Sequence, residues 1–207
     1  QDDKLVFVSN GIPGEDVVAE VIREHRHYIS ARVVKVISPS QHRIEPPCSY
    51  FGPCTGCQWQ HISYEYQLEL KRAIVIDALS RIGNFHNPSV LPTMAAPEPY
   101  GYRNHARFTV GAGGMLGFVS RQTLRFVRID SCLLMHQWIN ETLGTVQGHC
   151  WETTQLSMRY GINTGNWLVQ PTLHNPEILI SSGQKHYIEQ LNGSTFQVSA
   201  PSVFQVN

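Results

Sequence analysis

The chain has 207 residues, 42% of them apolar, which is enough for one large or two small globular cores. Sixteen basic and sixteen acidic residues cancel, so the net charge alone does not indicate a nucleic-acid partner. No apolar run approaches the roughly 20 residues of a membrane span and no signal peptide is recognisable, so we expect a monomeric, cytoplasmic protein without membrane contact.

The first 45 residues contain three short segments rich in Val and Ile, separated by turn residues such as Ile12-Pro13-Gly14. The segments cover residues 5–9, 17–23 and 31–38. They predict the strands of a small β-barrel. Because the chain opens directly into a strand, we expect its start to cut through this barrel.

A loop with three cysteines follows, in the spacing Cys48-x5-Cys54-x2-Cys57, and Cys132 lies far downstream. Iron-sulfur clusters take four thiolates, often three from one loop, whereas structural zinc usually takes paired knuckles. The spacing favours a 4Fe-4S cluster and leaves zinc as the alternative. Buried free thiols are a third possibility, which suits Cys150 better than the other four because it lies outside the pattern.

A helix is predicted from about Ser63 to Ile82, with Glu65 in its first turn and Gly83 as the C-terminal cap. Four apolar side chains fall on one face of this helix: Leu68, Val75, Leu79 and Ile82. We therefore expect the helix to pack against another part of the protein.

Strand patterns dominate after a connector at residues 84–101. A hairpin with Gly111-Ala112-Gly113-Gly114 at its tip is predicted to join strand 102–110 to strand 115–119. A helix near 134–147 and four strands follow, at 154–162, 166–173, 177–181 and 195–199. The predicted fold class is α+β, with a partial, OB-like β-barrel followed by a mixed α+β central domain.

The predicted strand 102–110 has a basic face, because Arg103, His105 and Arg107 alternate with mostly apolar residues. Residues 99–129 contain five arginines, including Arg121 and Arg125, and no Asp or Glu. Arginine and aromatic side chains contact phosphates and unstacked bases, so we predict RNA binding here and in a second basic segment, 23–43. The alternative is an ordinary solvated sheet face.

No motif for catalysis is recognisable: the chain has no GxGxxG, no P-loop, no HExxH helix and no Ser/His/Asp spacing. Residue patterns alone therefore identify no catalytic residue.

Four segments, in this order, resemble the bacterial 23S rRNA (uracil-C5)-methyltransferases that carry a TRAM domain. They are CSYFGPCTGCQWQHISYEYQLELK (48–71), YGYRNHARFTVG (100–111), IDSCLLMHQWIN (129–140) and VFQVN (203–207). Three positions depart from the family pattern: Thr55, Leu133 and Val203. None of these departures removes a cysteine of the cluster pattern.

The resemblance implies a 4Fe-4S cluster on Cys48, Cys54, Cys57 and Cys132, and a contact between Gln205 and S-adenosylmethionine. It implies ribosomal RNA as the partner. The implied domains are a partial TRAM RNA-binding barrel at 1–45, the iron-sulfur loop at 46–61, a helix packing on the catalytic domain at 62–83, a central RNA-binding domain at 97–200, and the start of the methyltransferase domain at 201–207.

In this family a Cys thiolate adds to uracil C6, the methyl group is transferred to C5, and a base then removes the C5 proton. The resemblance implies that this Cys, the base and the Rossmann-like methyl-donor domain lie beyond residue 207. We therefore expect no catalytic residue and no methyltransferase activity in these residues alone. The alternative function is a non-catalytic RNA-binding protein that holds an iron-sulfur cluster or zinc.

Overall fold

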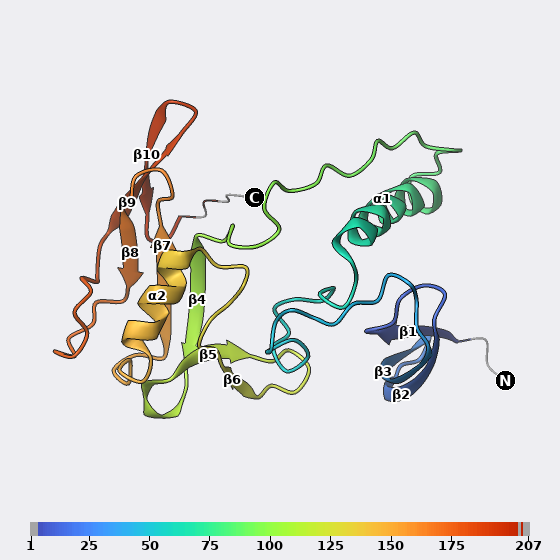
Figure 1. The fold of residues 1–207 in the computed structure, drawn as a ribbon, viewed down its shortest axis with the longest axis horizontal. Coiled ribbons are helices and arrows are strands. Elements are labelled where there is room, and N and C mark those ends of the chain that lie inside the picture. The colour runs from blue at the N-terminus through green and yellow to red at the C-terminus, as the bar shows by residue number, and fades with distance from the viewer. Residues whose placement is uncertain (1–3, 203, 205–207) are drawn as a thin grey trace. The chain divides into compact units, whose positions relative to one another are not determined.

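The computed structural model describes residues 4–202 and 204, which form an α+β fold (Figure 1). The chain divides into two compact units. One comprises residues 1–49 and 57–95, and the other comprises residues 50–56 and 96–207. The segment 50–56 of the cysteine loop therefore belongs to the second unit, although the chain on either side of it belongs to the first.

A three-stranded sheet forms the start of the first unit, with β1 (Leu5–Ser9), β2 (Asp16–Glu24) and β3 (Tyr28–Ser38) in the order β1-β3-β2. β1 pairs in parallel with β3, and β2 pairs antiparallel with β3. The three predicted strands are confirmed. The expected barrel is not, because β1 and β2 remain the two edges of an open sheet within the described residues.

This sheet buries little apolar surface. Six of its large apolar side chains are more than half exposed: Leu5, Phe7, Val21, Ile22, Val34 and Ile37. An ion pair at the end of the sheet provides the first unit with a specific internal contact instead. Arg43 Nε and Nη2 donate to the two carboxylate oxygens of Glu15, each over 2.6 Å.

The carboxylate of Glu15 is almost inaccessible, with 1% of its side chain exposed. The amides of Ile12 and Ser40 also donate to it, over 3.0 and 3.1 Å. These hydrogen bonds, above all those from Arg43, lower the pKa of Glu15 to about 2. The pair therefore ties the turn before β2 to the chain that leaves β3.

Helix α1 (Tyr64–Arg81) confirms the predicted helix. The strand-like pairing of Arg43 with Ile62 and the bond from Ser63 N to His42 O anchor its start to the first unit. The rings of His42 and Tyr66 stack with centroids 3.8 Å apart. Ser63 occupies the N-cap position without a side-chain capping bond.

The C-terminal end and the apolar face of α1 differ from expectation. Asn84, at φ 55°, adopts the left-handed conformation expected near Gly83. Within the described part of the chain, no residue of α1 is buried, and Val75 and Ile82 are 47% and 82% exposed. The packing predicted for this face is therefore not seen among the described residues.

The second unit is built on a five-stranded antiparallel sheet with the order β6-β5-β4-β7-β8. Its strands are β4 (His105–Val110), β5 (Leu116–Val119), β6 (Phe126–Arg128), β7 (Gln155–Tyr160) and β8 (Trp167–Gln170). A short 3-10 turn, η1 (Ala112–Gly114), joins β4 to β5. A hairpin of β9 (His186–Leu191) and β10 (Ser194–Ser199) follows.

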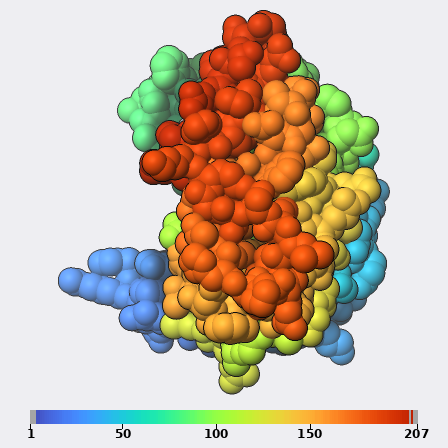
Figure 2. All heavy atoms as spheres, turned by 90° about the vertical axis from the view of Figure 1, so that its left-hand side faces the viewer, coloured from blue at the N-terminus to red at the C-terminus, as the bar shows by residue number. Residues whose placement is uncertain are grey.

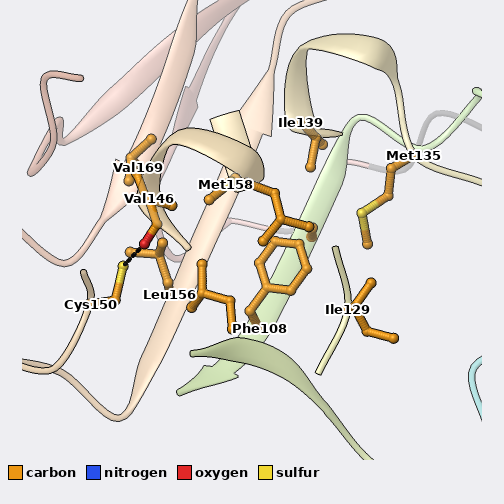
Figure 3. Close-up of a cluster of buried hydrophobic side chains, with 12 residues drawn as sticks. Phe108, Ile129, Met135, Ile139, Val146, Cys150, Leu156, Met158 and Val169 are labelled. Carbon is orange, nitrogen blue, oxygen red and sulfur yellow. Dashed lines mark hydrogen bonds between the residues drawn. The ribbon is translucent and has the colours of Figure 1, made fainter. Parts of the chain in front are cut away.

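Helix α2 (Gln137–Val146) packs on one face of this sheet and closes the main core (Figure 3). Its residues Ile139, Leu143 and Val146 are at most 1% exposed, and they recur at the spacing that puts one helix face inward. They meet Phe108 of β4 and the β7 residues Leu156 and Met158, all fully buried. The sheet therefore has one covered face and one polar face.

Most predicted elements of this unit are confirmed, including the glycine-tipped hairpin and the helix near 134–147. The predicted strands 154–162, 166–173 and 195–199 correspond to β7, β8 and β10. The predicted strand 177–181 is wrong, because Asn175 holds this segment in a turn: its carbonyl accepts from Ile178 N and its side chain accepts from Glu177 N. β6 and β9 were not anticipated.

Gly117 of β5 tests how tightly this sheet is packed. A Cβ atom at this position would lie 2.1 Å from the carbonyl oxygen of Val127 on β6. We predict that Gly117→Ala lowers the free energy of unfolding by about 2 kcal/mol, measured by urea denaturation. The control is Gly144→Ala in α2, where a Cβ meets nothing within 4 Å and should stabilise the helix by about 0.5 kcal/mol. Equal stabilities of the two variants would contradict this packing.

Arg43→Met removes the cation that neutralises Glu15. We predict a loss of about 3 kcal/mol at pH 7, because a buried carboxylate is left without its partner. The pKa of Glu15 is lowered by folding, so its stabilising contribution is complete above about pH 4.5 and is lost as the pH falls toward 2.

Urea denaturation at pH 7 and at pH 3 measures this effect, and the difference between the original protein and the variant should shrink at the lower pH. The double variant Glu15→Gln/Arg43→Met serves as control and should recover part of the loss at pH 7. A pH-independent difference would show that the ion pair is not its cause.

Candidate nucleic-acid interface

The polar face of the five-stranded sheet is centred on β4 and β7. Ala106 and Phe108 point into the core and are 4% and 0% exposed, whereas His105 and Arg107 are exposed on the other side. This alternation confirms the predicted face. We call the following set the basic face: His105, Arg107 and Thr109 of β4, with their β7 partners Arg159, Ser157 and Gln155.

Among the described residues, Arg107 forms no ion pair with an acidic side chain. Its Nε donates to Gln155 Oε1 over 2.9 Å, and its Nη2 donates to the same oxygen. Because an amide oxygen is neutral, this contact orients the guanidinium without cancelling its charge. Arg107 is thus held in place with its charge available to an anion.

His105 contributes hydrogen-bonding capacity more than charge. Its Nε2 lies 3.3 Å from Ser157 Oγ. Partial desolvation of the ring, together with the charges of Arg159 and Arg107, lowers the pKa of His105 below its ordinary value, although the residue remains exposed to solvent. At neutral pH the ring is therefore neutral and offers one donor and one acceptor nitrogen.

The β7–β8 side of the basic face is covered. Arg159 is only 7% exposed, and its Nη1 donates to the carbonyls of Ser199 and Ser202 over 3.4 and 2.7 Å. Leu168 of β8 joins Tyr187 and Val198 of the hairpin in a second small core. Figure 2 shows β8, β9 and β10, in orange to red, as a contiguous surface. The open part of the face therefore lies toward β4, β5 and β6.

The other predicted RNA contacts lie on different segments. Arg103 precedes β4, and its backbone is fixed by bonds from its N to Leu134 O and from His136 N to its O, 2.8 and 2.7 Å long. Arg121 and Arg125 are exposed in the turn between β5 and β6. The structure thus brings together His105 and Arg107, flanked by Arg103, and places Arg121 and Arg125 on a separate turn.

The turn that carries Arg121 contacts the cysteine loop. Arg121 N donates to Thr55 Oγ1 over 2.8 Å. Tyr50 fastens the same loop, since its hydroxyl accepts from Asp130 N over 3.0 Å and donates to Asp130 Oδ2 over 3.2 Å. The loop 50–56 is therefore docked two residues from Cys132.

Asn140 of α2 holds Cys132 from the other side. Its Oδ1 accepts from Cys132 N over 2.8 Å, and its Nδ2 donates to the carbonyls of Cys132 and Met135 over 3.1 and 3.2 Å. Cys54 and Cys132 both pack against the core beneath α2. Two of the four cysteines of the predicted cluster therefore lie against one core.

The donor chemistry of the four cysteines suits a cluster, and none of the four is in a disulfide. However, Cys48 and Cys57 belong to the first unit and Cys54 and Cys132 to the second. Across residues 4–202 and 204, no group of three or more His, Cys, Asp or Glu side chains is arranged to hold a metal ion. The fit is incomplete, and the cluster stays a prediction.

The remaining candidates are simpler. Cys150 is fully buried and its thiol donates to Val146 O over 3.4 Å (Figure 3). Burial raises the pKa of Cys150 to about 11, as expected for an unreactive structural thiol. Gln205, the predicted contact to S-adenosylmethionine, lies outside the described residues.

Among the helices described, none is long and apolar enough to cross a membrane.

Sequence reasoning missed the β7 side chains that complete the basic face. Gln155 and Ser157 are uncharged and carry no motif, and only the pairing of β7 with β4 places them beside Arg107 and His105. No signal in the chain could have revealed that pairing in advance.

No family model matches the chain. It is 32% identical to an uncharacterized RNA methyltransferase of Halalkalibacterium halodurans over 89% of the chain and 42% of that protein. It is 26% identical to one of Thermosynechococcus vestitus over 99% of the chain and 57% of that protein. A 23S rRNA (uracil(1939)-C(5))-methyltransferase of Xylella fastidiosa is 42% identical over 53% of the chain and 25% of that protein.

The fold is similar to the crystal structure of Pyrococcus abyssi tRNA (uracil-54, C5)-methyltransferase in complex with S-adenosyl-L-homocysteine. The TM-score is 0.67 at 20% identity, over 98% of the chain and 57% of that structure. The chain spans about half the length of the first two relatives. Its homologues are RNA methyltransferases, one of which is named for uracil C5.

Proposed function

We propose that the chain is the RNA-recognition part of an S-adenosylmethionine-dependent enzyme that makes 5-methyluridine in 23S rRNA. One observation supports this most: a chain homologous to RNA methyltransferases presents Arg107 on an open sheet face, and Arg107 forms no ion pair with any acidic residue between 4 and 202. A non-catalytic RNA-binding protein would present the same face, so the methylation itself is proposed from the homologues.

On this proposal the sheet acts as a rigid platform for RNA. Arg107 and Arg103 contact phosphates, since guanidinium groups bind phosphate oxygens through paired N–H donors. The neutral ring of His105 can donate to or accept from a base edge. Because α2 fills the space behind β4, the strand that carries His105 and Arg107 is fixed in place.

The first unit offers a second basic surface in the segment 23–43, for which we propose the role of a TRAM-like RNA-binding module. Arg32 pairs with Glu20 over 2.8 Å, and Arg43 pairs with Glu15. Arg23, Arg26 and Lys35 form no ion pair with any residue between 4 and 202 and are exposed. These three cations are therefore available to phosphates.

The methyl donor supplies the methyl group, and we propose Gln205 as the residue of this chain that contacts it. Residues corresponding to the nucleophilic Cys and the base of the resembled family are not assigned in these 207 residues. The chain's own contribution, on this proposal, is to bind and orient the RNA, without methyl transfer by these residues alone.

We also propose that Cys48, Cys54, Cys57 and Cys132 hold a 4Fe-4S cluster with a structural role. The three-plus-one spacing supports it, as does the docking of loop 50–56 near Cys132 through Tyr50. Zinc is the alternative with the same donors. The methylation itself needs no electron transfer, so the cluster would stabilise the loop.

Arg107→Gln tests the RNA platform. We predict about tenfold weaker binding to a 23S rRNA fragment, because a charge-assisted contact to phosphate is lost. The plot of log binding constant against log salt concentration should become less steep by about 0.7, the value for one lost contact to a single-strand phosphate. Lys185→Gln, an exposed cation outside the basic face, is the matched control and should bind as the original protein does. Equal binding by both variants would contradict the platform.

The cluster is tested on protein purified without oxygen. We predict about four iron and four sulfide per chain, absorbance near roughly 400 nm, and loss of both in Cys132→Ser. Cys150→Ala should keep its iron, since Cys150 is not a proposed ligand. Zinc without iron would favour the alternative metal, and a chain with neither metal would refute the proposal for all four cysteines.

A further inference from the structure

The open side of the basic face carries an exposed aromatic ring, that of Phe126 on β6. Val127 pairs with Phe118, and both pack against the core beneath α2. Because side chains alternate along a strand, Phe126 and Arg128 point to the opposite side, with Arg107. Phe126 is 37% exposed, and its register partner Val119 is 43% exposed.

Two glycines bring this ring close to the backbone. A Cβ atom at Gly117 would lie 2.9 Å from Phe126 Cζ, and one at Gly111 would lie 2.8 Å from Cε1. Either side chain would collide with the ring, so both glycines leave the space that the ring fills. One side of Phe126 is thus supported by the backbone of β5 and of the β4–β5 turn, and the ring is fixed in place while part of it stays open.

The charges around Phe126 favour a polyanion. The side-chain partner of Arg107 within residues 4–202 and 204 is the neutral Gln155. Asp130, two residues after Arg128, is bound to Arg128 over 2.7 Å and to the hydroxyl of Tyr50, so its charge is already paired. Phe126 and Arg107 lie on the same face of the sheet, on β6 and β4 with β5 between them. A supported aromatic ring and a guanidinium on one face form a combination that can bind an unstacked base and a neighbouring phosphate.

The size of the apolar patch argues against a protein partner. Phe126 and Val119 are each less than half exposed, at 37% and 43%, whereas a stable protein interface buries about 800 Å² on each partner. One nucleobase, in contrast, matches the area of one aromatic ring.

We propose that Phe126 is a base-stacking residue: an unpaired RNA base stacks on its open ring face while an adjacent phosphate contacts Arg107. This inference rests on the proposed RNA-binding function. It specifies the part of the RNA that binds to the basic face, namely an unpaired base and the phosphate next to it. It assigns a specific role to one aromatic residue of the segment 99–129, for which the sequence predicts RNA binding in general.

The experiment measures binding of the whole chain to two fluorescein-labelled probes, hexauridylate and an abasic ribose-phosphate hexamer of equal length. Phe126→Leu keeps apolar bulk over the two glycines and removes the aromatic face. We expect it to weaken hexauridylate binding by about tenfold, within the range of one lost base stack, and to leave the abasic probe unaffected. Phe196→Leu, which alters a Phe of β10 that is 42% exposed and lies outside this face, should bind both probes normally.

Phe126→Trp keeps an aromatic face and should bind hexauridylate at least as well as the original protein, which keeps the test decisive if Phe126→Leu proves unstable. Normal hexauridylate binding by Phe126→Leu, or equal losses for both probes, would overturn the stacking role. If Arg107→Gln then still weakened both probes, the proposed function would stand without it. If the original protein bound neither probe, the proposed function itself would fail.

Discussion

Burial of one face of the five-stranded sheet beneath α2 is the constraint on which the second unit depends. Phe108, Leu156 and Met158 must point toward α2 to be removed from water, so the residues between them must point away. A shift of one residue in the register of β4 would bury Arg107 and expose Phe108. The basic face is therefore a direct consequence of the core.

The same core also supports the cysteine loop. Asn140 lies on α2 and holds the backbone of Cys132, and Tyr50 ties the loop to Asp130. Asn140 lies on the helix whose apolar face is buried in the core, and Tyr50 itself packs against that core. The first unit differs, because most of its sheet is exposed and it contains an ion pair of Arg43 with the buried carboxylate of Glu15. Packing determines the geometry of one unit, and charge has a larger part in the other.

Strongly periodic segments could be predicted from the sequence, and long-range pairings could not. The alternation of β4 and the helix α1 followed from local patterns. β9 was missed because Glu189 interrupts its apolar pattern; this residue is 1% exposed and accepts from the amides of Ile162 and Asn163, which lie in a distant turn. Residues 177–181 have the composition of a strand, but Asn175 holds them in a turn.

The candidate RNA-binding face also depends on long-range strand pairings that the sequence does not predict. The alternation of β4 was enough to predict that Arg107 lies on the basic face. The support of the Phe126 ring above Gly117, in contrast, follows only from the pairing of β6 with β5. On the proposed function, RNA lies on the face of the sheet opposite α2. Photocrosslinking with a 4-thiouridine-substituted 23S rRNA fragment, followed by peptide mapping, identifies the residues that contact the RNA. Crosslinks within residues 103–109 and 119–128 are expected; crosslinks confined to α2 or to the β9–β10 hairpin would contradict this placement of the RNA.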